Sequence, residues 1–129
     1  MEKMKIIDID KADELVKKAR FWGENLSDAG LKTHQLRRIY DTVQGIYSQS
    51  DGKRLTQEQK DKLQFLKPLL AYVSSKKDNL KSLHEQLNPL IDEIGDDYRK
   101  LNNFYRFLQS ILAYHKYYEE EKKQKEGKQ

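Results

Sequence analysis

The sequence predicts an all-α protein, a single compact bundle of about five amphipathic helices. Apolar residues recur at intervals of three and four in five separate segments, which is the spacing of a buried helical face. Glycine and proline number only 6 and 2, too few for a protein built from tight turns. Residues 1–129 should therefore form one domain, and we expect its ends, 1–9 and 119–129, to be flexible.

The first helix is expected from about Lys11 to Ser27, with Asp8 or Asp10 as its cap and Gly30 just past its end. Its apolar face consists of Leu15, Ala19, Trp22 and Leu26.

The second helix is expected from Thr33, as N-cap, to about Ser48. Its apolar face consists of Leu36, Ile39, Tyr40, Val43, Ile46 and Tyr47. Arg37 and Arg38 stand between these apolar residues, so both should point away from the core. A polar loop over residues 48–55 should follow.

The third helix is expected to open at Thr56, because TQEQ matches the capping box in which Gln59 reaches back to the cap. Pro68 interrupts its apolar face. We therefore expect a kink or a brief break at Lys67. The helix should end within residues 74–79.

A fourth helix over residues 80–94 contains Pro89, where a kink is again expected, and Gly95 should end it. Asp96 or Asp97 should cap the fifth and strongest helix. Its apolar face consists of Tyr98, Leu101, Phe104, Tyr105, Leu108, Ile111, Leu112 and His115.

Several classes of protein are excluded by composition. The absence of cysteine rules out disulfides, thiolate zinc sites and a thiol nucleophile. No apolar run approaches the ~20 residues of a membrane span. The charged N-terminus lacks the apolar core of a signal peptide, so we expect a cytoplasmic protein.

Basic charge is concentrated in the middle of the chain. The net charge is +4, yet residues 31–77 contain ten Lys/Arg against four Asp/Glu, whereas residues 78–100 carry an excess of acids. A localised excess of this kind favours a polyanionic partner, and a lysine-rich solvated surface is the alternative.

No pattern in the sequence indicates catalysis. The P-loop, the Gly-rich dinucleotide turn, HExxH and the nucleophile elbow are all absent. His34 and His84 are isolated on different elements, and His115 falls on an apolar face, where a hydrogen-bonded core histidine is expected. We expect no catalytic residue, no metal and no cofactor, and we interpret most tyrosines as core packing.

The candidate binding residues are basic or amide side chains around the second and third helices. If these two helices are antiparallel, the end of the third returns to the start of the second, and the charges merge into one stripe. Such a stripe suits a phosphate backbone and would give little sequence preference. The set comprises Lys32, Gln35, Arg37, Arg38, Lys67, Lys76 and Lys77.

Three segments in order, LKTHQLRRIYDTV (31–43), LKPLLAYVSSKK (66–77) and FYRFLQSILAYHKYY (104–118), resemble the small helical subunit of type III-A CRISPR effector complexes, the Csm type. The resemblance implies a five-helix bundle without enzymatic activity. Several copies would lie along guide RNA and single-stranded target RNA, next to other subunits. It adds Lys116 as a candidate phosphate contact. Leu70 and the lysines of the second segment depart from the family pattern, so that segment is expected to bind less strongly.

Two alternatives remain open from the sequence. One is a helix-turn-helix DNA-binding regulator in which residues 33–43 form the recognition helix. The other is a structural helical adaptor that binds no nucleic acid.

Overall fold

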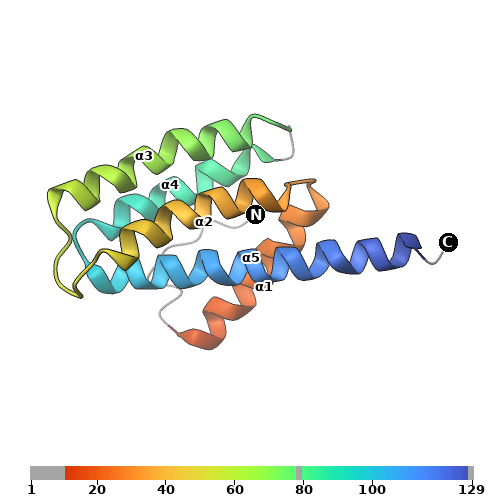
Figure 1. Cartoon of the computed structure of the whole chain (residues 1–129), viewed down its shortest axis with the longest axis horizontal. Coiled ribbons are helices and arrows are strands. Elements are labelled where there is room, and N and C mark those ends of the chain that lie inside the picture. The colour runs from red at the N-terminus through yellow and green to blue at the C-terminus, as the bar shows by residue number, and fades with distance from the viewer. Residues whose placement is uncertain (1–10, 78–79, 128–129) are drawn as a thin grey trace.

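The computed structural model describes residues 11–77 and 80–127 and shows five helices, with no strand among these residues (Figure 1). The prediction of an all-α bundle is therefore confirmed. The expected flexibility of residues 1–9 and the expected caps Asp8 and Asp10 lie outside the described residues. The helices are α1 (Ala12–Asp28), α2 (Thr33–Ser48), α3 (Gln57–Ser74), α4 (Ser82–Ile94) and α5 (Tyr98–Gly127).

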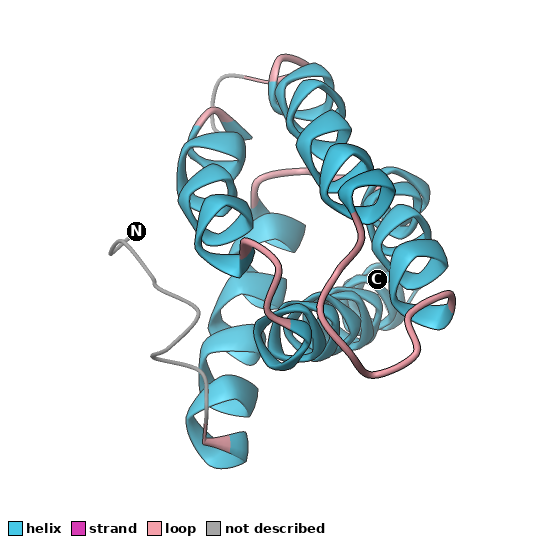
Figure 2. Ribbon diagram, turned by 90° about the vertical axis from the view of Figure 1, so that its left-hand side faces the viewer, coloured by secondary structure: helices cyan, strands magenta, loops and turns pink. Residues whose placement is uncertain are grey.

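The helices pack around one interior. Seen along the long axis, α2, α3, α4 and α5 surround this core, and α1 lies against α5 outside the ring (Figure 2). Trp22 of α1 meets Phe107 of α5 edge-to-face, with ring centroids 5.5 Å apart. Gly23 permits this close approach, since a Cβ there would lie 2.7 Å from the Cβ of Tyr114. No helix in the described part is long and apolar enough to cross a membrane.

Tyrosines join α2 to α5. Tyr47 stacks on Tyr105 with ring centroids 4.3 Å apart, and Tyr40 and Tyr98 extend the stack on either side. Their hydroxyls pair across the two helices, Tyr40 with Tyr105 at 3.2 Å and Tyr98 with Tyr47 at 3.3 Å. The four rings are half-buried against the core, so packing is confirmed as their role.

The helix starts follow local hydrogen bonds. In α3, Thr56 Oγ1 accepts from the Gln59 N–H at 3.2 Å, and Gln59 Oε1 accepts from the Thr56 N–H at 2.8 Å, which confirms the capping box. In α5, Asp97 Oδ1 accepts from the N–H of Arg99 at 2.9 Å. Asp97 is therefore the cap that the sequence predicted as Asp96 or Asp97.

The start of α2 differs from the prediction by one residue. Lys32, and not Thr33, is the N-cap, because Gln35 Oε1 accepts from the Lys32 N–H at 3.1 Å. The Thr33 hydroxyl turns instead toward His115 of α5. Thr33 thus contacts a residue of another helix, His115, instead of capping α2.

Both prolines lie inside continuous helices, so the brief break that was one of the two outcomes expected at Lys67 is absent, and the expected kinks stay predictions. Each proline removes one backbone hydrogen bond from its helix. Leu66 and Leu70 are buried on either side of Pro68, so burial of the apolar face supports a continuous helix across the proline.

Helix α5 continues to Gly127, so residues 119–127 are helical, and the expected flexibility of this end stays a prediction. Ion pairs stabilise this extension, which projects past the rest of the bundle (Figure 1). Lys116 pairs with Glu120 at 3.1 Å one turn along the helix, and Lys122 reaches Asp28 at the end of α1, 3.2 Å away. The remaining residues of the segment, 128–129, lie outside the described part.

Candidate nucleic-acid interface

The end of α3 lies beside the first turns of α2, as expected for antiparallel helices. Lys76 Nζ donates to the Tyr72 hydroxyl at 2.9 Å and lies 4.2 Å from the centre of the Tyr72 ring. The hydrogen bond from Lys76, followed by the charges of Lys76 and of Arg38 on α2, holds the pKa of the Tyr72 phenol below its ordinary value. Arg38 on α2 and Lys76 in the turn after α3 therefore act on one phenol.

Lys77 reaches the connection between α1 and α2. A Cβ on Gly30, which has a φ of +88°, would lie 2.5 Å from Lys77 Nζ. Lys32 follows Gly30 by two residues and is exposed. The two lysines after α3 and the lysine before α2 are thereby brought to one end of the bundle.

Five cations form what we call the basic edge, which consists of Lys32, Arg37, Arg38, Lys76 and Lys77. All five are exposed, and none forms an ion pair within the described residues. The positive end of the α2 dipole lies at the same place. The basic edge therefore carries a positive charge that the described part of the chain does not neutralise.

Three predicted residues do not join the basic edge in this way. Gln35 caps its own helix through the Lys32 N–H. Lys67 lies on the α4 side of α3, only 27% exposed, and pairs with Asp92 at 2.6 Å. Its hydrogen bond is the main reason why the pKa of Asp92 is lowered. Lys116 is beside the start of α2, but Glu120 pairs with it.

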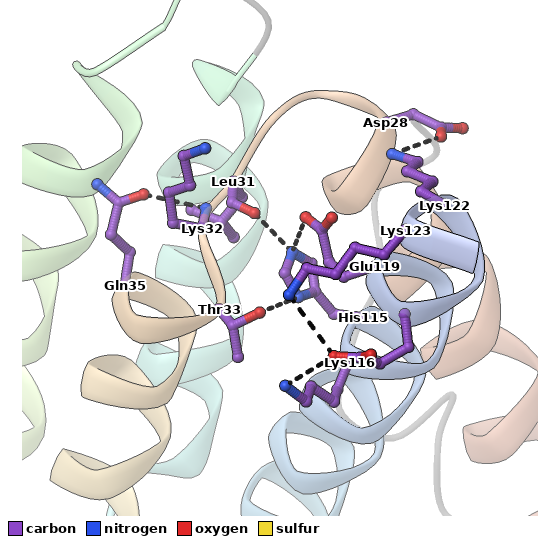
Figure 3. Close-up of polar contacts among 11 residues, drawn as sticks. Asp28, Leu31, Lys32, Thr33, Gln35, His115, Lys116, Glu119, Lys122 and Lys123 are labelled. Atoms are coloured by element: carbon purple, nitrogen blue, oxygen red, sulfur yellow. Dashed lines mark hydrogen bonds and ion pairs between the residues drawn. The ribbon is translucent and has the colours of Figure 1, made fainter. Parts of the chain in front are cut away.

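His115 fixes the start of α2 against α5 (Figure 3). Its ring is fully buried, with Nε2 2.6 Å from the Leu31 carbonyl and Nδ1 3.5 Å from Thr33 Oγ1. Burial lowers the pKa of His115, so we assign a neutral ring in which Nε2–H donates to Leu31 and Nδ1 accepts from Thr33. The expectation of a hydrogen-bonded core histidine is confirmed.

Acidic side chains near the helix ends have structural roles in the described residues. No group of three His, Asp or Glu side chains there could hold a metal ion. The acids Asp96 and Asp97 serve structure, since Asp96 pairs with Arg54 at 2.7 Å and Asp97 caps α5. The chemistry that the basic edge offers is the attraction and binding of an anion.

Sequence reasoning missed the part that Tyr72 plays in the site. The sequence analysis assigned Tyr72 no role. In the structure its side chain is 54% exposed, Lys76 donates to its hydroxyl, and the charge of Arg38 acts on it. The sequence could have predicted a contact between Tyr72 and Lys76, because a spacing of four residues corresponds to one helical turn.

The fold and the basic edge define a small helical bundle with one exposed cationic edge. Comparison with known families gives a match to the family described as Csm2 Type III-A, over residues 9–121. The chain belongs to this family and is a small subunit of the type III-A CRISPR complex. A similar protein, from Enterococcus italicus, carries the description "CRISPR system Cms protein Csm2"; it is 26% identical over 98 residues, which cover 69% of each chain. Family membership thus confirms the resemblance and disfavours the helix-turn-helix regulator.

Proposed function

We propose that this chain is a non-catalytic, RNA-binding subunit of the cytoplasmic type III-A complex. Its basic edge holds the sugar-phosphate backbone of guide RNA and single-stranded target RNA without reading sequence. Copies of the chain associate along the RNA and contact neighbouring subunits. Family membership supports the place in the complex, and the basic edge supports the RNA contact.

The observation that carries the proposal is the exposed positive charge that no described residue neutralises: Arg38 and Lys76 both act on Tyr72 near the end of α3, and Arg37 is the neighbour of Arg38 in the first turns of α2. Arginine presents a planar fork of donors that matches two phosphate oxygens at once. The lysines of the basic edge add point charges, and the α2 dipole adds to the attraction. Together they suit a backbone that crosses the start of α2.

Nothing in the basic edge is arranged to recognise base edges. In RNA-guided complexes the guide reads the target by base pairing, and protein holds the backbone and its shape. Binding by this surface should therefore tolerate any sequence and weaken steeply with salt.

The test is a gel-shift series with unstructured RNAs of increasing length at two salt concentrations. Wild-type protein should bind longer RNAs more tightly, because copies add along the strand. The variant Arg37→Glu/Arg38→Glu should lose most of this affinity at low salt, whereas the fold, followed by circular dichroism, should persist because both side chains are exposed.

A matched control variant distinguishes an effect of the basic edge on RNA binding from an effect of the net charge of the protein. Lys53→Glu/Lys60→Glu changes the net charge by the same amount at the other end of α3, away from Lys76. This control should retain most of the binding. Equal losses in both variants, or binding that does not depend on RNA length, would contradict the proposal and favour the adaptor without nucleic acid.

A further inference from the structure

The ring of Tyr72 is exposed on a firmly held part of the backbone, the last turn of α3. Its side chain is 54% exposed, whereas the next two residues, Val73 and Ser74, are buried. Ser74 Oγ also accepts a hydrogen bond from the His84 N–H of α4 at 3.2 Å. The backbone that carries the ring is therefore anchored to the bundle, while the ring itself faces solvent.

Two cations of the basic edge lie beside this ring. Lys76, in the turn after α3, donates to the Tyr72 hydroxyl at 2.9 Å and lies 4.2 Å from the ring centre. The charge of Arg38 on α2 acts on the same phenol and lowers its pKa. Both cations are exposed, and neither forms an ion pair with another residue in the described part of the chain.

An exposed aromatic ring beside un-neutralised cations is the combination with which proteins bind single-stranded nucleic acid. The cations hold phosphates, and the ring stacks on the face of a base. Lys76 also restrains the ring of Tyr72 through the hydrogen bond and the cation–π contact, so a base that stacks there orders few further atoms.

We propose that Tyr72 stacks on an unpaired base of the RNA whose phosphates the basic edge holds. This inference rests on the proposed function and adds an uncharged contact to it. Stacking uses the face of a base and not its hydrogen-bonding edge, so it adds affinity without sequence preference. A base inside a duplex already stacks on its neighbours, and its face is not accessible. Tyr72 therefore makes the basic edge favour single-stranded over double-stranded RNA.

The first test is fluorescence anisotropy with a labelled RNA that has no self-complementarity. Tyr72→Ala should weaken binding about tenfold, whereas Tyr72→Phe keeps the ring and should stay within about twofold of wild type. The matched control is Tyr117→Ala. Tyr117 is 57% exposed on α5, in a groove lined by Arg20 and Glu24 of α1, and its loss should leave the affinity unchanged. Circular dichroism should show that each variant is folded.

The second test separates stacking from charge. Inorganic polyphosphate is a polyanion without bases, so Tyr72→Ala should bind it as wild type does, and the same should hold for double-stranded RNA. Arg37→Glu/Arg38→Glu should lose affinity for polyphosphate and for both kinds of RNA. The loss caused by Tyr72→Ala should also be equal at two salt concentrations, because no phosphate contact is removed.

The outcomes distinguish this inference from the proposed function. An affinity of Tyr72→Ala for single-stranded RNA equal to wild type, an equal loss in Tyr117→Ala, or an equal loss on polyphosphate would overturn the inference. A Tyr72→Ala variant that binds RNA normally but no longer co-purifies with other subunits would also overturn it and assign the ring to a protein contact. In all of these cases the effect of Arg37→Glu/Arg38→Glu still tests the basic edge. Wild-type protein that binds no RNA would contradict the proposed function, and this inference with it.

Discussion

His115 should make the stability of the bundle depend on pH between 5.5 and 7.5. Its buried ring donates to the Leu31 carbonyl, and burial holds its pKa below the ordinary value of 6.5. The hydrogen bond to Leu31 and the charge of Glu119, 3.6 Å away, oppose this lowering of the pKa, and Lys122 reinforces it. The unfolded chain thus takes up a proton near pH 6.5 that the folded protein resists. Stability should fall as the pH drops below this value.

The size of the effect follows from proton linkage. Between pH 7.5 and 5.5 the proton taken up by the unfolded state removes up to about 1.4 kcal/mol of stability. Urea denaturation should register this as a midpoint lower by about 0.7 M, for a typical slope of about 2 kcal/mol/M. Circular dichroism at a series of pH values provides the measurement.

The variant His115→Gln isolates this contribution. Its amide can still donate a hydrogen bond but cannot gain a charge, so most of the pH dependence in this range should disappear. Its stability at pH 7.5 should be lower by about 1–3 kcal/mol, because the fit and one hydrogen bond are disturbed. A wild-type stability that is flat from pH 7.5 to 5.5, or an equal slope in the variant, would refute the reasoning.

Two further predictions concern packing and charge within the bundle. Gly23→Ala should destabilise the protein by about 1–3 kcal/mol, since the new Cβ would meet Tyr114 Cβ at 2.7 Å and force α1 away from α5; thermal denaturation measures this. Lys67→Met should cost at most about 1 kcal/mol at pH 7, because Asp92 is 58% exposed. The lowered pKa of Asp92 means that this cost is present above its titration and lost as the pH falls through it, so urea denaturation should show a smaller difference at pH 3.

The helices could be predicted from sequence because each has an apolar face at helical spacing and most ends have local signals. The capping box at Thr56 and the acidic cap of α5 depend on residues within one turn, and both were found. The N-cap of α2 was misplaced because His115, 82 residues from Thr33, draws away the Thr33 hydroxyl. Contacts over such separations are not visible in local patterns.

The candidate site could be predicted only in part, for the same reason. The antiparallel return of α3 follows from a short loop, and it correctly brings Lys76 to the start of α2. Lys67 looked equivalent in sequence, yet Asp92, 25 residues away on α4, neutralises it. Charge in a sequence shows how many cations exist, and only packing shows which of them remain unpaired.

The length of α5 was underestimated because the absence of apolar residues after Tyr118 was interpreted as an absence of structure. Pairs between charges one turn apart were in the sequence and could have corrected this, as Lys116 and Glu120 show. The pair between Lys122 and Asp28 of α1 depends on tertiary packing and could not have been predicted.

The salt dependence of RNA affinity tests the central claim most directly. For single-stranded RNA, the slope of log K against log salt is about −0.7 for each phosphate neutralised. Arg37→Gln/Arg38→Gln should therefore make the slope shallower by about 1.4, if each arginine holds one phosphate. Lys53→Gln/Lys60→Gln should leave the wild-type slope. Identical slopes for wild type and Arg37→Gln/Arg38→Gln would contradict the claim that the basic edge holds the RNA backbone.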